Sequence, residues 1–159
     1  MGSIINSARR SKIEGVLISV LKQIEDERGA VLHMLRSDSP IFTEFGEIYF
    51  SLVNKGVVKA WKRHKVMTQR IAVPIGRIRL VLFDNRTKSA TKGVVEEIIL
   101  GRPDQYYLIC IPPLLWYGFQ GISESPALLV NCSDIPHDTK ESELLSVLND
   151  HISYSWEQI

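Results

Sequence analysis

The chain has 159 residues and a formal net charge of +1, which argues against a general attraction to nucleic acid or to an anionic membrane. Its hydrophobic fraction of 45% and charged fraction of 23% are ordinary for a globular domain, and no apolar run is long enough to span a bilayer. Residues 1–12 contain basic residues but no apolar signal core, so we expect a flexible N-terminal segment, one domain over 1–159 and a cytoplasmic location. Cys110 and Cys132 lie in apolar runs, and we expect both to be buried and unpaired.

Short segments of β-type composition alternate with turn signals along most of the chain. The predicted strands are residues 15–24, 30–35, 47–53, 57–61, 77–83, 94–100, 106–111 and 127–132. Their close spacing leaves no room for helical crossovers, and it predicts an all-β sandwich or barrel. One short helix is expected near Lys140–Val147, where Leu144, Leu145 and Leu148 share a helical face.

The stretch that opens at Gly56 and closes at Gly76 has the spacing of the first cupin motif. That motif places His-x-His and then Glu between its two glycines, and these three side chains bind a metal. The corresponding residues here are Lys62, His64 and Gln69. A protonated lysine cannot coordinate a cation, and an amide is a weak ligand beside a carboxylate. The motif therefore predicts a small β-barrel whose cavity holds no metal.

A second cupin-like motif follows the predicted strand 106–111. The family form is Pro-x-Gly-x-x-His, and the chain has Pro112, Leu114 and Tyr117 at these positions. Tyr117 thus replaces the last metal-binding His, and only His64 keeps a ligand side chain. Since a metal site normally needs three or more protein ligands, we expect no metal.

Further segments extend the likeness over most of the chain. They are residues 26–29, 45–51, 56–61, 76–86, 111–113, 118–119, 132–134 and 149–156. In their order and spacing, the chain resembles the dTDP-4-dehydrorhamnose 3,5-epimerase family, a metal-free branch of the cupins. The resemblance implies a jelly-roll cupin that acts on a nucleotide-linked 4-keto-6-deoxy sugar in deoxysugar and polysaccharide biosynthesis. A homodimer is expected, because the open sheet edges of such small barrels need covering.

The family reaction removes the proton next to a C4 ketone and returns it from the opposite face of the sugar. It needs a base, a group that stabilises the enolate oxygen, and an acid across the ring. This enolate chemistry requires no redox cofactor. The resemblance puts Lys62 at the position of the base and Asp150 at that of its supporting carboxylate. It puts Gln69, with Arg70 beside it, at the enolate oxygen, and Tyr117 at the position of a second cavity His.

The residues leave the identity of the base open between Lys62 and His64. The two share strand parity and should project to the same face. A buried Lys62 would have a pKa near neutrality, whereas pairing with Asp150 would keep it charged. His64 has an ordinary pKa that already suits proton transfer. The alternatives are structural: a solvated lysine in a basic run, and a histidine that only makes hydrogen bonds.

Two cations are expected to bind the nucleotide. Arg28 aligns with a family Arg that grips the phosphates, and its alternative role is that of a turn residue before Gly29. Lys59 aligns with a family Arg that contacts the ligand, although strict alternation would point it away from Lys62. Either a β-bulge intervenes or the assignment of Lys59 is wrong.

Aromatic and acidic residues complete the predicted substrate site. The resemblance implies that Trp116 and Tyr117 close the mouth of the cavity; the alternative is that both rings pack inside the sandwich. Glu47 and Tyr49 belong to the matching segment 45–51 and are also assigned to substrate binding.

Two classes of function remain open. The first is an epimerase or isomerase, including a ketoisomerase that moves the carbonyl between C3 and C4 through the same enolate. The second is a catalytically silent cupin that only binds the nucleotide sugar. The family acid is a Tyr on the segment 127–132, where this chain has none. An orientation of Tyr117 or Tyr49 toward the centre of the cavity would favour the enzyme.

Overall fold

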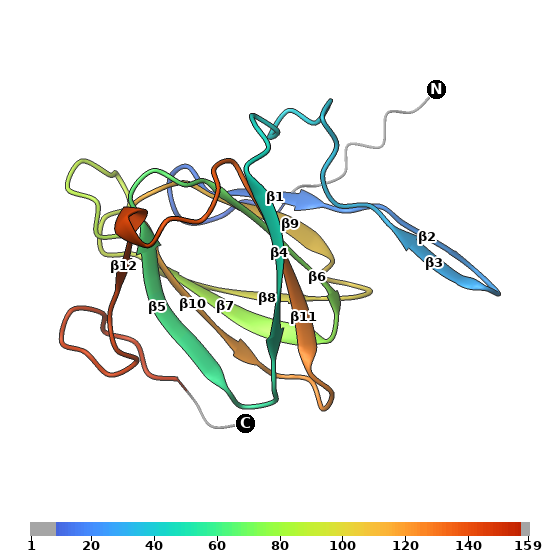
Figure 1. Ribbon diagram of the computed structural model, residues 1–159. Helices are drawn as coiled ribbons and strands as arrows, with labels where there is room; N and C mark the ends of the chain where they lie inside the picture. The colour runs from blue at the N-terminus through green and yellow to red at the C-terminus, as the bar shows by residue number, and fades with distance from the viewer. Residues whose placement is uncertain (1–8, 157–159) are drawn as a thin grey trace.

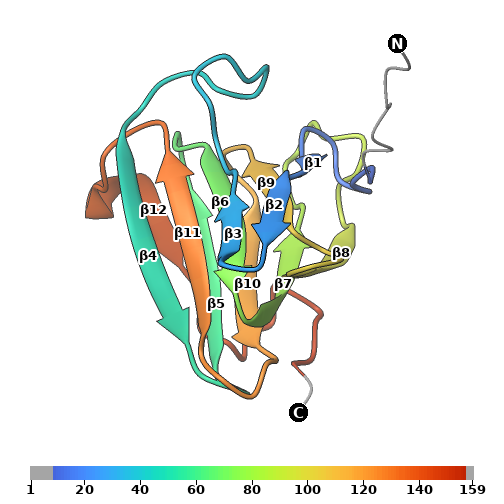
Figure 2. The same cartoon turned by 90° about the vertical axis from the view of Figure 1, so that its right-hand side faces the viewer.

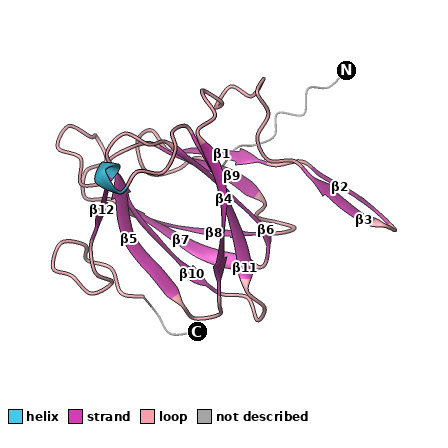
Figure 3. Cartoon of the chain, viewed as in Figure 1, coloured by secondary structure: helices cyan, strands magenta, loops and turns pink. Residues whose placement is uncertain are grey.

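The computed structural model describes residues 9–156 (Figure 1). In this part of the chain nearly all regular structure is β-strand, with one 3-10 turn, η1 (Thr139–Glu141) (Figure 3). The strands are β1 (Leu17–Val20), β2 (Gln23–Asp26), β3 (Gly29–Leu32), β4 (Glu47–Val53), β5 (Val58–His64), β6 (Gln69–Ile75), β7 (Arg77–Phe83), β8 (Val95–Gly101), β9 (Tyr107–Ile111), β10 (Trp116–Gly121), β11 (Ala127–Ser133) and β12 (Ser142–Leu144). The predicted all-β architecture is confirmed.

Two five-stranded antiparallel sheets face each other and form a sandwich. The first sheet has the order β1-β9-β6-β11-β4, and the second has the order β12-β5-β10-β7-β8. A separate hairpin, β2–β3, projects away from the sandwich in Figure 1 and is seen in front of the strands in Figure 2. Sequence neighbours such as β5 and β6 lie in different sheets, and this exchange between layers is typical of a jelly roll.

The main core lies between the sheets and follows the pleat of the central strands. On β7, Ile78, Leu80 and Leu82 are completely buried, as alternate positions on one face of a strand should be. They pack with residues of the facing sheet such as Ile71 and Leu129. Each such side chain stabilises the fold by about 1.5–3 kcal/mol relative to exposure.

A β-bulge interrupts the pairing of β5 with β10. Tyr117 pairs with Lys62, but the next residue, Gly118, pairs with Ala60, so Trp61 is the extra residue. Glycine is required at 118, because a Cβ there would lie 2.4 Å from the Cβ of Ala60. The bulge reverses the alternation of β5 on either side of Trp61.

Some predicted strands match the structure and others do not. Residues 47–53 and 77–83 are strands with the expected bounds, whereas the predicted strand 15–24 divides into β1 and β2 around Leu21. Three strands were not predicted: β6, β10 and β12. The first five residues of β6 and all six of β10 are buried, so neither strand has the polar–apolar alternation that identifies a half-buried strand.

The helix predicted near Lys140–Val147 is wrong. Ser142–Leu144 forms β12 on the open edge of β5, because pairing with that edge satisfies the backbone groups of both strands. The leucines of the predicted helical face do not share a surface: Leu145 packs near Trp61, whereas Leu148 is 89% exposed.

The N-terminal prediction can be assessed only in part, since residues 1–8 lie outside the described residues. The described remainder is attached to the sandwich, where Ser11 and the amide of Lys12 donate hydrogen bonds to buried Glu96. Cys110 and Cys132 are buried and unpaired, as predicted. Within residues 9–156 there is no helix with the length and apolar character needed to cross a membrane.

Candidate active site

A cavity of about 420 Å³ lies between the two sheets. Its walls combine apolar side chains from the core with polar groups from both sheets, as is usual for small-molecule sites. The first sheet contributes Tyr49, Ser51, Gln69, Ile71, Leu129 and Asn131; the second contributes Lys59, Ala60, Trp61, Lys62, Tyr117 and Phe119, and Leu144 and Leu145 complete the wall.

The bulge in β5 directs two cations into this cavity. Lys59 and Lys62 both line it, although strict alternation would separate them, so of the two alternatives left open by the sequence the bulge is the one present. The ammonium of Lys59 donates to the backbone oxygen of Leu52 at 2.6 Å and to Ser51 at 3.0 Å. Lys59 is exposed, and Lys62 is half-buried. The cavity therefore has a positively charged, solvent-facing side.

The wall formed by the first sheet contains a neutral polar network. Asn131 pairs directly with Tyr49 across β11 and β4. Its side-chain amide donates to the Tyr49 hydroxyl at 2.8 Å and to the side-chain oxygen of Gln69 at 3.1 Å. Burial raises the pKa of Tyr49, and the hydrogen bond from Asn131 only partly offsets this. Tyr49 is therefore a neutral, positioned hydroxyl at neutral pH.

At the inner end of the cavity, Tyr117 is backed by His64. The His64 Nε2 atom lies 3.4 Å from the Tyr117 hydroxyl, and the two rings are stacked with an interplanar angle of 13°. His64 is only 2% exposed. Its other ring nitrogen, Nδ1, is hydrogen-bonded to the carboxylate of Glu141, which ends the 3-10 turn.

The electrostatics of this group follow from burial and from its hydrogen bonds. Burial lowers the pKa of His64, and the neighbouring Glu141 carboxylate offsets this only in part. Burial alone would raise the pKa of Glu141, but hydrogen bonds from His64 and from backbone amides hold it below its usual value. Burial also raises the pKa of Tyr117. At neutral pH the three groups are a phenol, a neutral imidazole and a carboxylate.

Asp150 and Arg70 lie outside the cavity. Asp150 is exposed on the C-terminal loop, and Glu141 is the carboxylate that contacts a candidate base. Arg70 follows Gln69 on β6, so its side chain points to the other face of the first sheet. There it donates to the backbone oxygen of Ile41 at 2.7 Å and to Thr43 at 2.9 Å. The roles predicted for Asp150 and Arg70 are therefore corrected.

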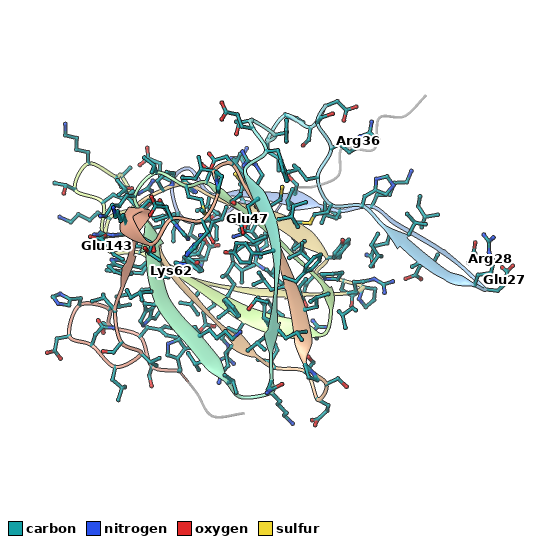
Figure 4. All side chains as sticks on the ribbon, in the orientation of Figure 1. Glu27, Arg28, Arg36, Glu47, Lys62 and Glu143 are labelled. Carbon is teal, nitrogen blue, oxygen red and sulfur yellow. The ribbon has the colours of Figure 1, made fainter. Side chains whose placement is uncertain are left out.

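Three residues predicted to bind substrate do not line the cavity of this chain. Arg28 lies at the tip of the β2–β3 hairpin, where it pairs with Asp26, whereas Lys62 lies within the sandwich (Figure 4). Trp116 packs on the outer side of the second sheet, under the guanidinium of Arg63. Glu47 is half-buried and accepts a hydrogen bond from the amide of His137 at 2.8 Å.

The donor set of the cavity does not suit a metal ion. The residues at the cupin ligand positions are Lys62, His64, Gln69 and Tyr117, of which only the buried His64 is a common metal ligand. Among residues 9–156 there is no group of three or more His, Cys, Asp or Glu side chains that could hold one.

Sequence reasoning missed Glu141 and Asn131. Glu141 is 77 positions from His64, and no motif connects them. Asn131 could have been suspected, because it lies on the segment 127–132, where the family has its catalytic Tyr. In the structure, Tyr49 on the neighbouring strand lies directly opposite Asn131.

Comparison with known proteins shows which family the chain belongs to. The sequence model of the family described as dTDP-4-dehydrorhamnose 3,5-epimerase matches residues 10–159. The chain belongs to this family. The resemblance inferred from the motifs is therefore confirmed, and with it the cupin fold and membership among epimerases of nucleotide sugars.

Individual relatives support the same assignment. A solved structure of a dTDP sugar isomerase from Desulfovibrio desulfuricans is 54% identical, with a TM-score of 0.89 over 91% of this chain and 92% of that one. The "Probable low-salt glycan biosynthesis epimerase Agl13" of Haloferax volcanii is 34% identical over 75% of this chain and 77% of its own length. A spore coat polysaccharide biosynthesis protein of Bacillus subtilis is 26% identical over 91% of this chain and 96% of its own.

Proposed function

We propose that this protein epimerises or isomerises a nucleotide-linked 4-keto-6-deoxy sugar in polysaccharide biosynthesis. The proton next to the ketone would be removed and returned inside the cavity between the sheets. Family membership supports the substrate class, and the composition of the cavity supports the chemistry. Proton transfer through an enolate requires an acid or base, such as a hydroxyl or imidazole group, and a cation near the enolate oxygen. Tyrosine hydroxyls and lysine ammonium groups line this cavity.

The observation that carries the proposal is the position of two tyrosines on opposite walls. Tyr49 comes from β4 of the first sheet, and Tyr117 comes from β10 of the second. Inversion of a carbon needs one proton donor or acceptor on each face of the sugar ring. Two such groups replace the tyrosine that the segment 127–132 lacks, and this favours an enzyme over a silent binder.

Charged and amide groups complete the reaction. The ammonium of Lys62 stabilises the negative charge that develops on the enolate oxygen, with Gln69 as a second donor. Lys59, on the exposed side of the cavity, attracts the diphosphate of the nucleotide. An Arg28 contact with phosphate cannot be made within one chain, since this residue is at the hairpin tip; it requires a second copy.

The homodimer is part of the proposal. Ile48, Phe50 and Leu52 lie on the outward face of edge strand β4, and they are 50%, 65% and 64% exposed. Three large apolar side chains on one face of an edge strand are typical of an interface. We expect a dimer by light scattering after size exclusion, and Phe50→Lys should shift it toward monomer. A wild-type monomer at high micromolar concentration would contradict the dimer.

The test of the reaction is deuterium incorporation. Wild-type protein with a dTDP-linked 4-keto-6-deoxy sugar in heavy water should place deuterium on a carbon next to the ketone. Nuclear magnetic resonance of the product then distinguishes inversion at C3 or C5 from movement of the ketone to C3. Wild-type protein that binds the sugar without incorporating deuterium would establish the silent binder instead.

Tyr49→Phe makes this test sharper. If Tyr49 protonates the face opposite to the one that loses its proton, the variant should still exchange deuterium while inversion falls by roughly two orders of magnitude. Tyr106→Phe is the matched control, because its hydroxyl does not line the cavity and donates to the backbone oxygen of His33 at 2.8 Å. Equal loss of exchange and inversion in Tyr49→Phe would contradict a role confined to one face.

A further inference from the structure

Glu141 fixes the position of the proton on His64. One carboxylate oxygen of Glu141 contacts Nδ1 of His64, and the other accepts the backbone amides of Lys65, Val66 and Met67 at 3.2, 3.1 and 3.2 Å. An ionised carboxylate only accepts hydrogen bonds, so Nδ1 must carry a proton. In a neutral imidazole the other nitrogen, Nε2, then has a free lone pair.

That lone pair faces Tyr117. The hydroxyl of Tyr117 lies 3.4 Å from Nε2, and Tyr117 lines the cavity whereas His64 lies behind it. His64 therefore reaches the cavity through the phenol. The order Glu141, His64, Tyr117 has the same logic as a carboxylate–histidine–hydroxyl triad, in which the carboxylate orients the imidazole and the imidazole takes the hydroxyl proton.

We propose that Glu141, His64 and Tyr117 form a proton relay, in which Tyr117 contacts the sugar and His64 accepts the hydroxyl proton of Tyr117. This inference rests on the proposed epimerase or isomerase function. In the forward step the C–H bond next to the ketone breaks, its proton goes to the Tyr117 oxygen, and its electron pair forms the enolate. In the same step the hydroxyl proton of Tyr117 moves to Nε2 of His64. The resulting imidazolium lies against the Glu141 carboxylate, so the charges balance and no oxidant or reductant is needed.

The relay assigns different roles to groups that the sequence could not separate. Tyr117 is the catalytic residue, since it alone of the three lines the cavity. His64 and Glu141 act through it, with Glu141 as a positioning residue. Lys62 keeps the role of stabilising the enolate rather than that of base.

The relay can be tested by changing only the carboxylate. In Glu141→Gln the side-chain oxygen can still accept the backbone amides, but the new NH₂ group donates to Nδ1 of His64. The proton of His64 then moves to Nε2, where it blocks transfer from Tyr117. We expect kcat for deuterium exchange to fall by roughly two to four orders of magnitude, as for Tyr117→Phe, with KM changed less than about threefold.

Two matched controls accompany these variants. Glu143→Gln changes a carboxylate two residues away that pairs with Arg63 at 2.5 Å, outside the relay. Tyr106→Phe removes a hydroxyl remote from the cavity. Both should retain kcat. Nitrogen-15 resonances of His64 provide a readout without substrate: the wild type should show the Nδ1–H tautomer, and Glu141→Gln should show the Nε2–H tautomer.

The outcomes separate the relay from the function on which it rests. If the wild type exchanges deuterium and either Tyr117→Phe or Glu141→Gln keeps kcat within threefold, the relay is overturned and the epimerase or isomerase stands. An Nε2–H tautomer in the wild type also overturns the relay. A wild type that binds the sugar without any exchange refutes the proposed function itself. Should Glu141→Gln not fold, Tyr117→Phe and the wild-type tautomer still decide the question.

Discussion

The two ends of the cavity differ in charge and in access to water. The side formed by β5 carries the ammonium groups of Lys59 and Lys62, which are exposed and half-buried. The inner end holds Tyr117 over the buried pair His64 and Glu141. Exposed cations attract an anion over a distance, but solvent screens them. Buried, hydrogen-bonded groups begin the reaction in a defined protonation state and orientation, which a positioned acid or base requires. We therefore assign nucleotide binding to the Lys59 side and proton transfer to the Tyr117 end, with Lys62 between them beside Tyr117.

The largest effect is expected when the imidazole at the inner end of the cavity is removed. His64→Gln should lower kcat for deuterium exchange by roughly two to four orders of magnitude, because an amide cannot take up a proton. The dissociation constant for dTDP should change little, since His64 does not line the cavity. Exposed His151 provides the control variant His151→Gln. Retention of kcat in His64→Gln would remove proton transfer from the inner end.

Lys62 lies between the two ends of the cavity, and its substitution distinguishes a role in catalysis from a role in binding. Lys62→Met should reduce kcat by roughly two to three orders of magnitude if the ammonium stabilises the enolate, the range for removal of one oxyanion donor. Steady-state kinetics should be compared with Lys65→Met, which removes an exposed lysine bonded to the backbone oxygen of Lys140. A rise in KM with unchanged kcat would instead place Lys62 with the binding end.

The pH dependence of kcat/KM should reflect the lowered pKa of buried His64. Because burial lowers its pKa, kcat/KM should begin to fall only below about pH 6.5, and then about tenfold per pH unit. The groups that act on this titration are Glu141, which raises the pKa, and Lys62 and His137, which lower it. Tyr117 is the partner on the cavity side.

The lowered pKa of His64 also makes the free energy of unfolding depend on pH. Between the ordinary pKa of about 6.5 and the lower folded value, the unfolded chain binds the extra proton, so the free energy of unfolding falls as the pH falls. Urea unfolding at pH 7.5 and 5.5 should show a smaller pH effect in His64→Gln than in the wild type. An equal effect in both proteins would argue against a lowered pKa of His64.

The smallest effect is expected at the exposed side. Lys59→Met should weaken dTDP binding by about two- to fivefold, because an exposed charge contributes only ~1 kcal/mol or less. The loss should shrink at high salt. Calorimetric titration beside Lys55→Met, which removes a lysine paired with Glu124 on the surface, provides the comparison. A decrease in kcat in Lys59→Met without weaker binding would contradict the division between the two ends.

Local pattern explains which parts of the fold could be predicted. The segment 47–53 alternates between half-buried and exposed residues along most of its length, so its period is visible in the sequence. β6 and β10 have no such period, because both of their faces are covered. The apolar pattern near Leu144 suggested a helix, yet the free edge of β5 gave this segment better backbone pairing.

The strand-rich class, the family, and the motif residues Lys62, His64 and Tyr117 could all be predicted from the sequence. These properties depend on spacing along one segment, where neighbouring positions fix the face of a strand. The fold was needed to show that Glu141 rather than Asp150 contacts His64, and that Tyr49 lies opposite Asn131. Both contacts join segments at least 77 residues apart through the order of strands in a sheet or the position of a turn, and no local pattern encodes them.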